Sequence, residues 1–182
     1  MRHGVSGRLV VAWASTASAD ERLARLAEAV TGAVSGNARI VRACRACGSD
    51  RHGKPYVVGL DGPIHVNLSR SGGIAVLAVC DAGPVGIDVE ALHPGGTPDV
   101  ATWVRKECVV KATGHGLTID PDLVEVTPPG SAPALVAWPE TEPLDSPVWM
   151  YDVECPAGYV AAAAVLSNAA PELLMTPASP EG

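Results

Sequence analysis

The sequence predicts a globular protein of mixed α and β structure. Of its 182 residues, 47% are hydrophobic and 18% are charged, which is the composition of a chain with a buried core. One segment repeats apolar residues at three- to four-residue intervals, as an amphipathic helix does, and a second opens with residues typical of a helix start. The remaining apolar segments are short and separated by turns rich in Gly and Pro, as strands are. The length suits one domain, or two small ones that share a core.

The N-terminal part predicts a strand followed by a helix. Residues 8–14 form an apolar run that ends at a Ser- and Thr-rich turn. Ser18 and Glu21 then have the spacing of a capping box, and Gly32 or Gly36 can end the helix. The apolar residues of this helix fall on one face, and they are Leu23, Leu26, Ala27, Val30 and Val34.

The middle of the chain predicts β structure. Residues 44–55 contain Gly, Ser, Asp and Pro and are expected to form a loop, and residues 64–69 look extended. The apolar segments 74–80 and 85–91 are separated by the turn 81–84. We expect these two segments to be the paired strands of one hairpin.

A second helix is predicted to open at Thr97, which is followed by Pro98 at the first helical position and Asp99 in the first turn. It should continue to about Thr113 and stop at Gly114. The tail from residue 171 is rich in Pro and Glu and is expected to be loosely held. Between helix and tail, strands are predicted at 123–126, 134–138, 148–154 and 159–167.

The net charge, the cysteines and the apolar stretches indicate which partners and which cellular location to expect. The formal net charge of -7 argues against nucleic acid, because binding to phosphate backbones needs a basic face. The five cysteines are scattered and no secretory segment is recognised, so we expect reduced thiols and a cytoplasmic location. The longest apolar stretches, 9–14 and 160–166, are much shorter than the ~20 residues that a membrane span needs.

Two carboxylates follow one another on the predicted strand 85–91. Alternate side chains of a strand share a face, so Ile87 and Val89 should enter the core while Asp88 and Glu90 lie side by side on the other face. Their repulsion would be relieved by a hard divalent cation such as Mg²⁺. The alternative is a half-exposed strand with ordinary solvated acids.

The second helix carries a stripe of functional groups. Trp103, Glu107 and Lys111 are spaced four residues apart, and Lys106 flanks them. A Glu with a Lys four residues later is also a common exposed helix pair. Only three of the 13 basic residues are lysines, however, and Lys54 is the third.

Two further segments could contact phosphate groups. Residues 67–73 look like a Ser- and Gly-rich turn with open backbone N–H groups, and Arg70 adds a guanidinium suited to an anion. Residues 52–56 carry Lys54. Either segment alone is as consistent with a plain loop.

Taken together, the segments resemble the signature of the surfactin-type (Sfp-like) 4'-phosphopantetheinyl transferases. The resemblance covers roughly residues 44–117. It rests on Gly53-Lys54-Pro55, Asn67-Leu68-Ser69-Arg70-Ser71-Gly72, Gly86-Ile87-Asp88-Val89-Glu90, and Trp103-Val104-Arg105-Lys106-Glu107-Cys108-Val109-Val110-Lys111 with Gly114-His115-Gly116-Leu117.

The resemblance implies both a fold and an activity. The fold is α+β, with two similar halves packed as an intramolecular pseudo-dimer around a coenzyme A cleft: 1–91, 92–170, and a tail at 171–182. The activity is Mg²⁺-dependent transfer of phosphopantetheine from coenzyme A to a serine of an acyl, peptidyl or polyketide carrier protein.

The resemblance also implies roles for individual residues. Asp88, Glu90 and Glu107 look like the metal-binding acids. Glu107 would also be the general base, and Lys111 would stabilise the diphosphate and the leaving group. The expected contacts to coenzyme A are Gly53, Lys54, Pro55, Ser69, Arg70, Lys106 and Lys111.

The chain departs from the family pattern at two places. Arg70 stands where the family has His, and residues 91–102 replace a longer segment that helps dock the carrier, which makes this a shortened member. One alternative is a repurposed relative that binds coenzyme A or a related diphosphate without transfer. Another is a zinc module on Cys44, Cys47 and His52; because no fourth ligand has suitable spacing, a reduced surface loop is favoured.

Overall fold

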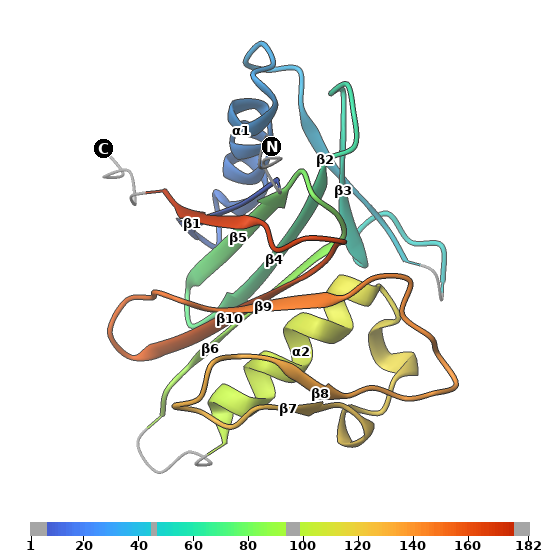
Figure 1. Ribbon diagram of the computed structural model, residues 1–182. Helices are drawn as coiled ribbons and strands as arrows, with labels where there is room; N and C mark the ends of the chain where they lie inside the picture. The colour runs from blue at the N-terminus through green and yellow to red at the C-terminus, as the bar shows by residue number, and fades with distance from the viewer. Residues whose placement is uncertain (1–6, 45–46, 94–98, 177–182) are drawn as a thin grey trace, which may run out of the picture.

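The computed structural model describes residues 7–44, 47–93 and 99–176 (Figure 1). In this part of the chain the strands and helices follow one another as β1 (Arg8–Ser15), α1 (Ala19–Thr31), β2 (Arg39–Ala43), β3 (Lys54–Val58), β4 (His65–Ser71), β5 (Ile74–Cys80), β6 (Val85–Ala91), α2 (Val100–Thr113), the 3₁₀ turns η1 (Gly116–Thr118) and η2 (Pro121–Leu123), β7 (Glu125–Val126), β8 (Leu135–Ala137), β9 (Val148–Val153), β10 (Tyr159–Leu166) and β11 (Glu172–Met175).

Two sheets form the centre of the molecule. The first has the strand order β11-β1-β5-β4, in which β11 runs parallel to β1 and the other neighbours are antiparallel. The second has the order β6-β10-β9 and is antiparallel throughout. The pairs β2-β3 and β7-β8 form two small separate sheets.

The two central sheets face each other, and each carries one helix on its outer face. Figure 1 shows α1 above the first sheet and α2 below the second. Alternation along the strands explains these layers. In β1, Leu9 and Val11 enter the cluster between the sheets, whereas Val10 contacts the cluster that α1 covers. In β10, Ala161 and Ala163 enter the same central cluster.

The first helix is held by its apolar face and by a glycine. Leu23 and Ala27 are fully buried against the sheet. Gly32 ends the helix at φ 70, as predicted. The predicted capping box does not form, since Ser18 makes no side-chain cap bond and its hydroxyl lies 2.8 Å from that of Ser15.

A glycine lets α2 lie directly on β6. A Cβ atom at Gly86 would stand 2.0 Å from the carbonyl oxygen of Cys108 and 2.3 Å from the amide nitrogen of Ala112. Both atoms are backbone and cannot rotate away. The helix therefore approaches the strand as closely as backbone allows only because position 86 has no side chain.

A buried arginine anchors α2 on its other side. Arg105 is 2% exposed, and its guanidinium donates to both carboxylate oxygens of Asp152, at 2.9 and 2.6 Å. The same group donates to the carbonyl oxygens of Thr127, Pro128 and Ser131. These bonds satisfy the buried charge and fix the axial position of the helix.

The predicted hairpin of segments 74–80 and 85–91 is wrong. Both segments are strands, but β5 pairs with β1 and β4, while β6 pairs with β10 in the other sheet. Because both edges of β5 are already occupied, β6 cannot join it. The turn at residues 81–84 therefore carries the chain from one sheet to the other.

Residues 67–71 are not a turn. They belong to β4, with Asn67 to Ser71 in register with β5, so the backbone N–H groups expected to be open lie in a strand. The turn is confined to Gly72 and Gly73. In the expected loose tail, β11 pairs with β1 and Thr176 donates its N–H to the carbonyl oxygen of Val11.

The prediction of mixed α and β structure is confirmed, and α2 ends at Gly114 as expected. Thr97 and Pro98, predicted to open this helix, lie outside the described residues. The pseudo-dimer of two similar halves and the boundary at residue 91 stay predictions. Neither helix in the described ranges combines the length and the apolar character that a membrane crossing requires.

Replacing Gly86 by Ala should destabilise the fold by roughly 3 kcal/mol, because the new methyl group meets immovable backbone of α2. Chemical denaturation followed by circular dichroism measures this loss.

Gly62→Ala is the matched control. Gly62 has a positive φ of 87°, a strain that Gly86 lacks, but nothing lies within 4 Å of its Cβ position. That variant should lose only about 1 kcal/mol. Equal losses in the two variants would contradict the close approach of α2 to β6.

Candidate active site

Side chains join the edges of the two central sheets. The backbones of β4 and β6 do not pair, but the side chain of Asn67 accepts a bond from the N–H of Ile87 at 3.2 Å. The hydroxyl of Ser71 accepts from the N–H of Ala91 at 3.1 Å. We call this line of contacts the β4–β6 seam. It brings the polar face of β4 against the acidic face of β6.

The centre of the seam is an ion pair with a shared hydroxyl. The ammonium of Lys111 lies 2.5 Å from Oδ1 of Asp88, and the hydroxyl of Ser69 donates to the same oxygen at 2.7 Å. Lys111 also donates to Ser69 at 3.1 Å. Three residues from β4, β6 and α2 thus meet within hydrogen-bond distance.

The second oxygen of Asp88 has no such partner. Asp88 is only 3% exposed, so it is not the solvated edge acid of the alternative interpretation. Its Oδ2 is fully buried and has no hydrogen-bond partner among the described residues. A buried carboxylate oxygen without a partner is costly, and a cation is what it would accept.

Two further carboxylates, Glu90 and Glu107, lie in the electrostatic environment of Asp88. Glu90 accepts a bond from Ser71 at 3.0 Å. Burial raises the pKa of Glu107; the charge of Lys111 lowers it, and the charges of Asp88 and Glu90 raise it further. The oxygens of the three acids do not all lie within 4.8 Å of one another. The acids share one electrostatic environment without forming a closed cluster.

The other two lysines, Lys54 of β3 and Lys106 of α2, lie apart from the Asp88 pair. The ammonium of Lys54 lies 3.5 Å from the carbonyl oxygen of Ala112, at the C-terminal end of the helix, where a cation is stabilised. Its charge, after burial, contributes to lowering the pKa of His65. Lys106 instead donates to the carbonyl oxygen of Pro121 at 3.0 Å, away from the Asp88 pair.

Arg70 belongs to a cation cluster that the sequence did not reveal. Asp20, at the start of α1, accepts bonds from Arg42 at 2.6 Å and from Arg70 at 2.9 Å. The hydrogen bonds from Arg42 lower the pKa of Asp20 most; partial burial opposes this, and the charges of both arginines add to the lowering. Two guanidinium groups from β2 and β4 are therefore held together by one carboxylate.

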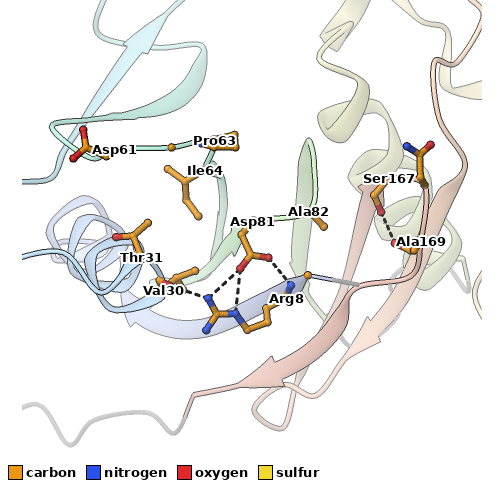
Figure 2. Close-up of a pocket in the computed structure, with 13 residues that line it drawn as sticks. Arg8, Val30, Thr31, Asp61, Pro63, Ile64, Asp81, Ala82, Ser167 and Ala169 are labelled. Atoms are coloured by element: carbon orange, nitrogen blue, oxygen red, sulfur yellow. Dashed lines mark hydrogen bonds and ion pairs between the residues drawn. The ribbon is translucent and has the colours of Figure 1, made fainter. Parts of the chain in front are cut away.

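One described pocket lies away from the seam. A pocket of about 970 Å³ lies beside the start of β1 and the turn after β5, and none of the predicted site residues lines it (Figure 2). Two of its three charged residues are paired with each other: Arg8 donates to Asp81 at 3.0 Å, and also to the carbonyl oxygen of Val30 at 2.9 Å. The pocket therefore offers no unpaired charge from these groups to an anion.

A third group of donors gathers in the loop between β2 and β3. The ligand atoms of Cys44, Cys47 and His52 all lie within 4.8 Å of one another. Gly53 follows at φ 102, and a Cβ there would stand 2.6 Å from the carbonyl oxygen of Ala43, so the loop closes tightly.

The structure thus unites some predicted site residues and separates others. Ser69, Asp88 and Lys111 touch, while Glu90 and Glu107 lie close by in the same seam. Asn67 and Ser71 are contacts that the sequence prediction missed, although their alternation with Ser69 along one strand is a signal that could have revealed them. No local pattern links Asp20 with Arg42 and Arg70, because the three lie on separate elements.

Comparison with known proteins agrees with the motifs. No model of a protein family matches the chain. A curated 4'-phosphopantetheinyl transferase from Bacillus subtilis is 33% identical over a 104-residue alignment, which covers 43% of this chain and 46% of the relative. The chain thus matches less than half the length of that curated relative. The similarity supports the 4'-phosphopantetheinyl transferase superfamily that the motifs suggest.

Replacing Lys111 by Met should lower the free energy of unfolding by roughly 3 kcal/mol at neutral pH, because the buried carboxylate of Asp88 loses its counter-ion. The double variant Asp88→Asn/Lys111→Met should recover much of that loss. Urea denaturation of the single and double variants measures both values.

Lys106→Met is the control, since Lys106 donates only to a carbonyl oxygen in the interactions described. A loss as large as that of Lys111→Met would show that shortening any lysine of α2 is enough. The ion pair would then not be the cause.

Asp20→Asn should destabilise the protein by up to about 1 kcal/mol at neutral pH, because the side chain is 44% exposed and its pairs are partly screened. The pKa of Asp20 is lowered from 3.8, so its stabilisation is present above that value and is lost as pH falls through the folded-state pKa. Thermal unfolding of both proteins from neutral to acid pH should show the two curves converge.

The exposed Asp61 offers a comparison. Asp61→Asn should change stability little at any of these pH values, so convergence specific to Asp20→Asn identifies the arginine cluster as the source. A difference from wild type that stays constant with pH would contradict the assignment.

Proposed function

We propose that this protein transfers the 4'-phosphopantetheine group of coenzyme A to a serine of an acyl, peptidyl or polyketide carrier protein. One observation carries the proposal: the shared contact of Ser69, Asp88 and Lys111, with an unpartnered carboxylate oxygen buried beside it. The similarity to a 4'-phosphopantetheinyl transferase names the chemistry that such a contact can serve.

Mg²⁺ fits the donors at this contact. Carboxylate oxygens are the ligands that this hard cation prefers, and Oδ2 of Asp88 is buried without a hydrogen-bond partner. Asp88, Glu90 and Glu107 would hold the ion, which when bound neutralises charge on the diphosphate of coenzyme A. Burial raises the pKa of Glu107 most and the charges of Asp88 and Glu90 raise it further, so a bound cation would lower it.

Lys111 has the position needed to act on the diphosphate. Its ammonium compensates the charge of Asp88 in the structure and is 29% exposed, so substrate can reach it. As the bond between the β-phosphorus and the bridging oxygen breaks, negative charge gathers on the departing 3',5'-ADP. We assign to Lys111 the stabilisation of that charge.

Glu107 is the general base of the proposed reaction. The carrier serine oxygen forms the new bond to the β-phosphorus, and its proton passes to the Glu107 carboxylate. Burial raises the pKa of this carboxyl, and a higher pKa makes it a stronger proton acceptor once it is ionised. No covalent intermediate on the enzyme is required.

The nucleotide end of coenzyme A would lie near the first half of the chain. Gly53 precedes β3, which begins with Lys54 and Pro55, and Ser69 and Arg70 lie on β4; Lys54 and Ser69 both contact α2. Arg70 would offer its guanidinium to the 3'-phosphate, where the family has an imidazole. Lys106 would lie nearby, with donors of its ammonium left over beside the one bonded to Pro121.

The finer assignment belongs to the same proposal. We infer a surfactin-type member with a shortened segment at 91–102, two similar halves divided near residue 91, and a cytoplasmic location. The carrier would dock on the side of the seam where Trp103 of α2 is 46% exposed.

The transfer itself is tested by intact-mass analysis of several apo carrier proteins incubated with the protein, coenzyme A and Mg²⁺. We expect a gain equal to one phosphopantetheine group on at least one carrier. Asp88→Ala should reduce the rate by at least about 100-fold, since the metal and Lys111 both lose their anchor.

Asp145→Ala, at an exposed position, is the control and should keep full activity. Calorimetry with coenzyme A separates two failures. Binding without transfer to any carrier would favour a repurposed relative, and absence of binding by the folded protein would overturn the proposal.

A further inference from the structure

Three soft donor groups meet in the loop between β2 and β3, outside the proposed diphosphate site. The sulfur of Cys47 lies 3.3 Å from Nε2 of His52, and the sulfur of Cys44 is within 4.8 Å of both. Two thiols and one imidazole are the donor set that zinc and other thiophilic ions select.

The backbone of the loop brings these side chains together. Ala43 and Lys54 are partners in the β2–β3 ladder, so the loop begins and ends on one rung. The N–H of Gly48 donates to the carbonyl oxygen of Cys44 at 2.8 Å, and the N–H of Cys44 donates to Ser49 at 2.9 Å. These bonds turn the chain back just after the second cysteine.

A glycine at each turn makes this geometry possible. Gly48 has a φ of 70 and Gly53 a φ of 102. At Gly53 a side chain would collide with the carbonyl oxygen of Ala43 and with Cα of Cys44, at 2.6 and 2.8 Å. The close approach at Gly53 returns His52 to the first cysteine.

We propose that Cys44, Cys47 and His52 bind one Zn²⁺ ion through two thiolates and an imidazole nitrogen. In a tetrahedral site with Zn–S and Zn–N bonds of normal length, neighbouring ligand atoms are roughly 3.5–3.8 Å apart. The sulfur of Cys47 lies 3.3 Å from Nε2 of His52, and all three ligand atoms lie within 4.8 Å of one another. Small side-chain movements would bring them to this spacing.

The fourth position of this site would be open. Among the described residues the group has three members, and Cys47 and His52 are exposed. A closed structural site needs four protein ligands, whereas a three-ligand site takes water or an exogenous ligand at the fourth position. The lack of a fourth ligand with suitable spacing in the sequence therefore argues against a closed zinc site, but not against an open three-ligand site.

The ion would stiffen the start of β3. It would link the first residue after β2 to His52, two positions before Lys54, and so close the loop over the residues that begin the strand. Lys54 reaches the C-terminal end of α2. We therefore expect zinc to tighten the binding of coenzyme A. This expectation rests on the proposed function, whereas the zinc site does not.

The site is tested on the full chain, reduced and freed of metal, by titration with Co²⁺. We expect one ion per chain with the intense visible absorption of a tetrahedral cobalt–thiolate centre, displaced by Zn²⁺. Cys47→Ser and His52→Ala should each weaken cobalt binding at least about tenfold. Cys155→Ser, which removes a thiol that donates to the carbonyl oxygen of Tyr159, should bind as wild type does.

Three results would overturn the zinc site: no cobalt spectrum from fully reduced wild type, unchanged binding by Cys47→Ser, or a Cys44–Cys47 disulfide as the stable form under mild reduction. Circular dichroism establishes that the exposed-residue variants are folded. Coenzyme A affinity, measured with and without zinc, is a separate readout. An unchanged affinity would overturn only the stiffening of β3, and no binding in either state would overturn the proposed function while leaving the zinc site standing.

Discussion

The buried carboxylate of Asp88 is the constraint on which the rest of the structure depends. An ionised group at 3% exposure is tolerated only if it is paired and hydrogen-bonded. One oxygen receives both Lys111 of α2 and Ser69 of β4, so a single atom ties three elements together. Lys111 can reach it because Gly86 has no side chain and α2 rests on the backbone of β6. The need to pair this charge therefore fixes how the helix lies.

The position of the site follows from the way the two sheets meet. The edges of β4 and β6 face each other without a backbone ladder, so their polar side chains take the place of ladder bonds, as Asn67 does for the N–H of Ile87. If the backbones of β4 and β6 formed a continuous ladder, no polar side chains would be needed to satisfy these backbone groups. Because the seam is instead made of side chains, it can hold charge and present it to a ligand. The seam thus performs a structural task and supplies the groups of the proposed chemistry.

Much of this was open to prediction from sequence, and the failures have a common cause. The ends of β5 and α1 are predicted nearly correctly, because β5 is a continuous apolar run buried on both faces and α1 repeats apolar residues along one buried face. Which strands pair with one another was not predicted correctly. The turn at 81–84 has the composition of a hairpin turn, yet β5 already has two neighbours, and nothing local records that. The cluster of Asp20 with two arginines, and the convergence of Cys44, Cys47 and His52, likewise depend on distances across the fold.

The two proposed metal sites have different donor atoms, and they therefore select different classes of metal ion. Carboxylates at the seam suit a hard cation such as Mg²⁺, whereas two thiolates and an imidazole suit a soft or borderline one, so neither ion competes well for the other site. They are nevertheless joined by contiguous contacts: His52 leads into Lys54, Lys54 reaches Ala112, and Ala112 follows Lys111 in α2. How firmly the loop is closed therefore bears on how firmly the Lys54 ammonium is held at the helix end. Because that helix also supplies the partner of Asp88, order in the loop favours order in the seam.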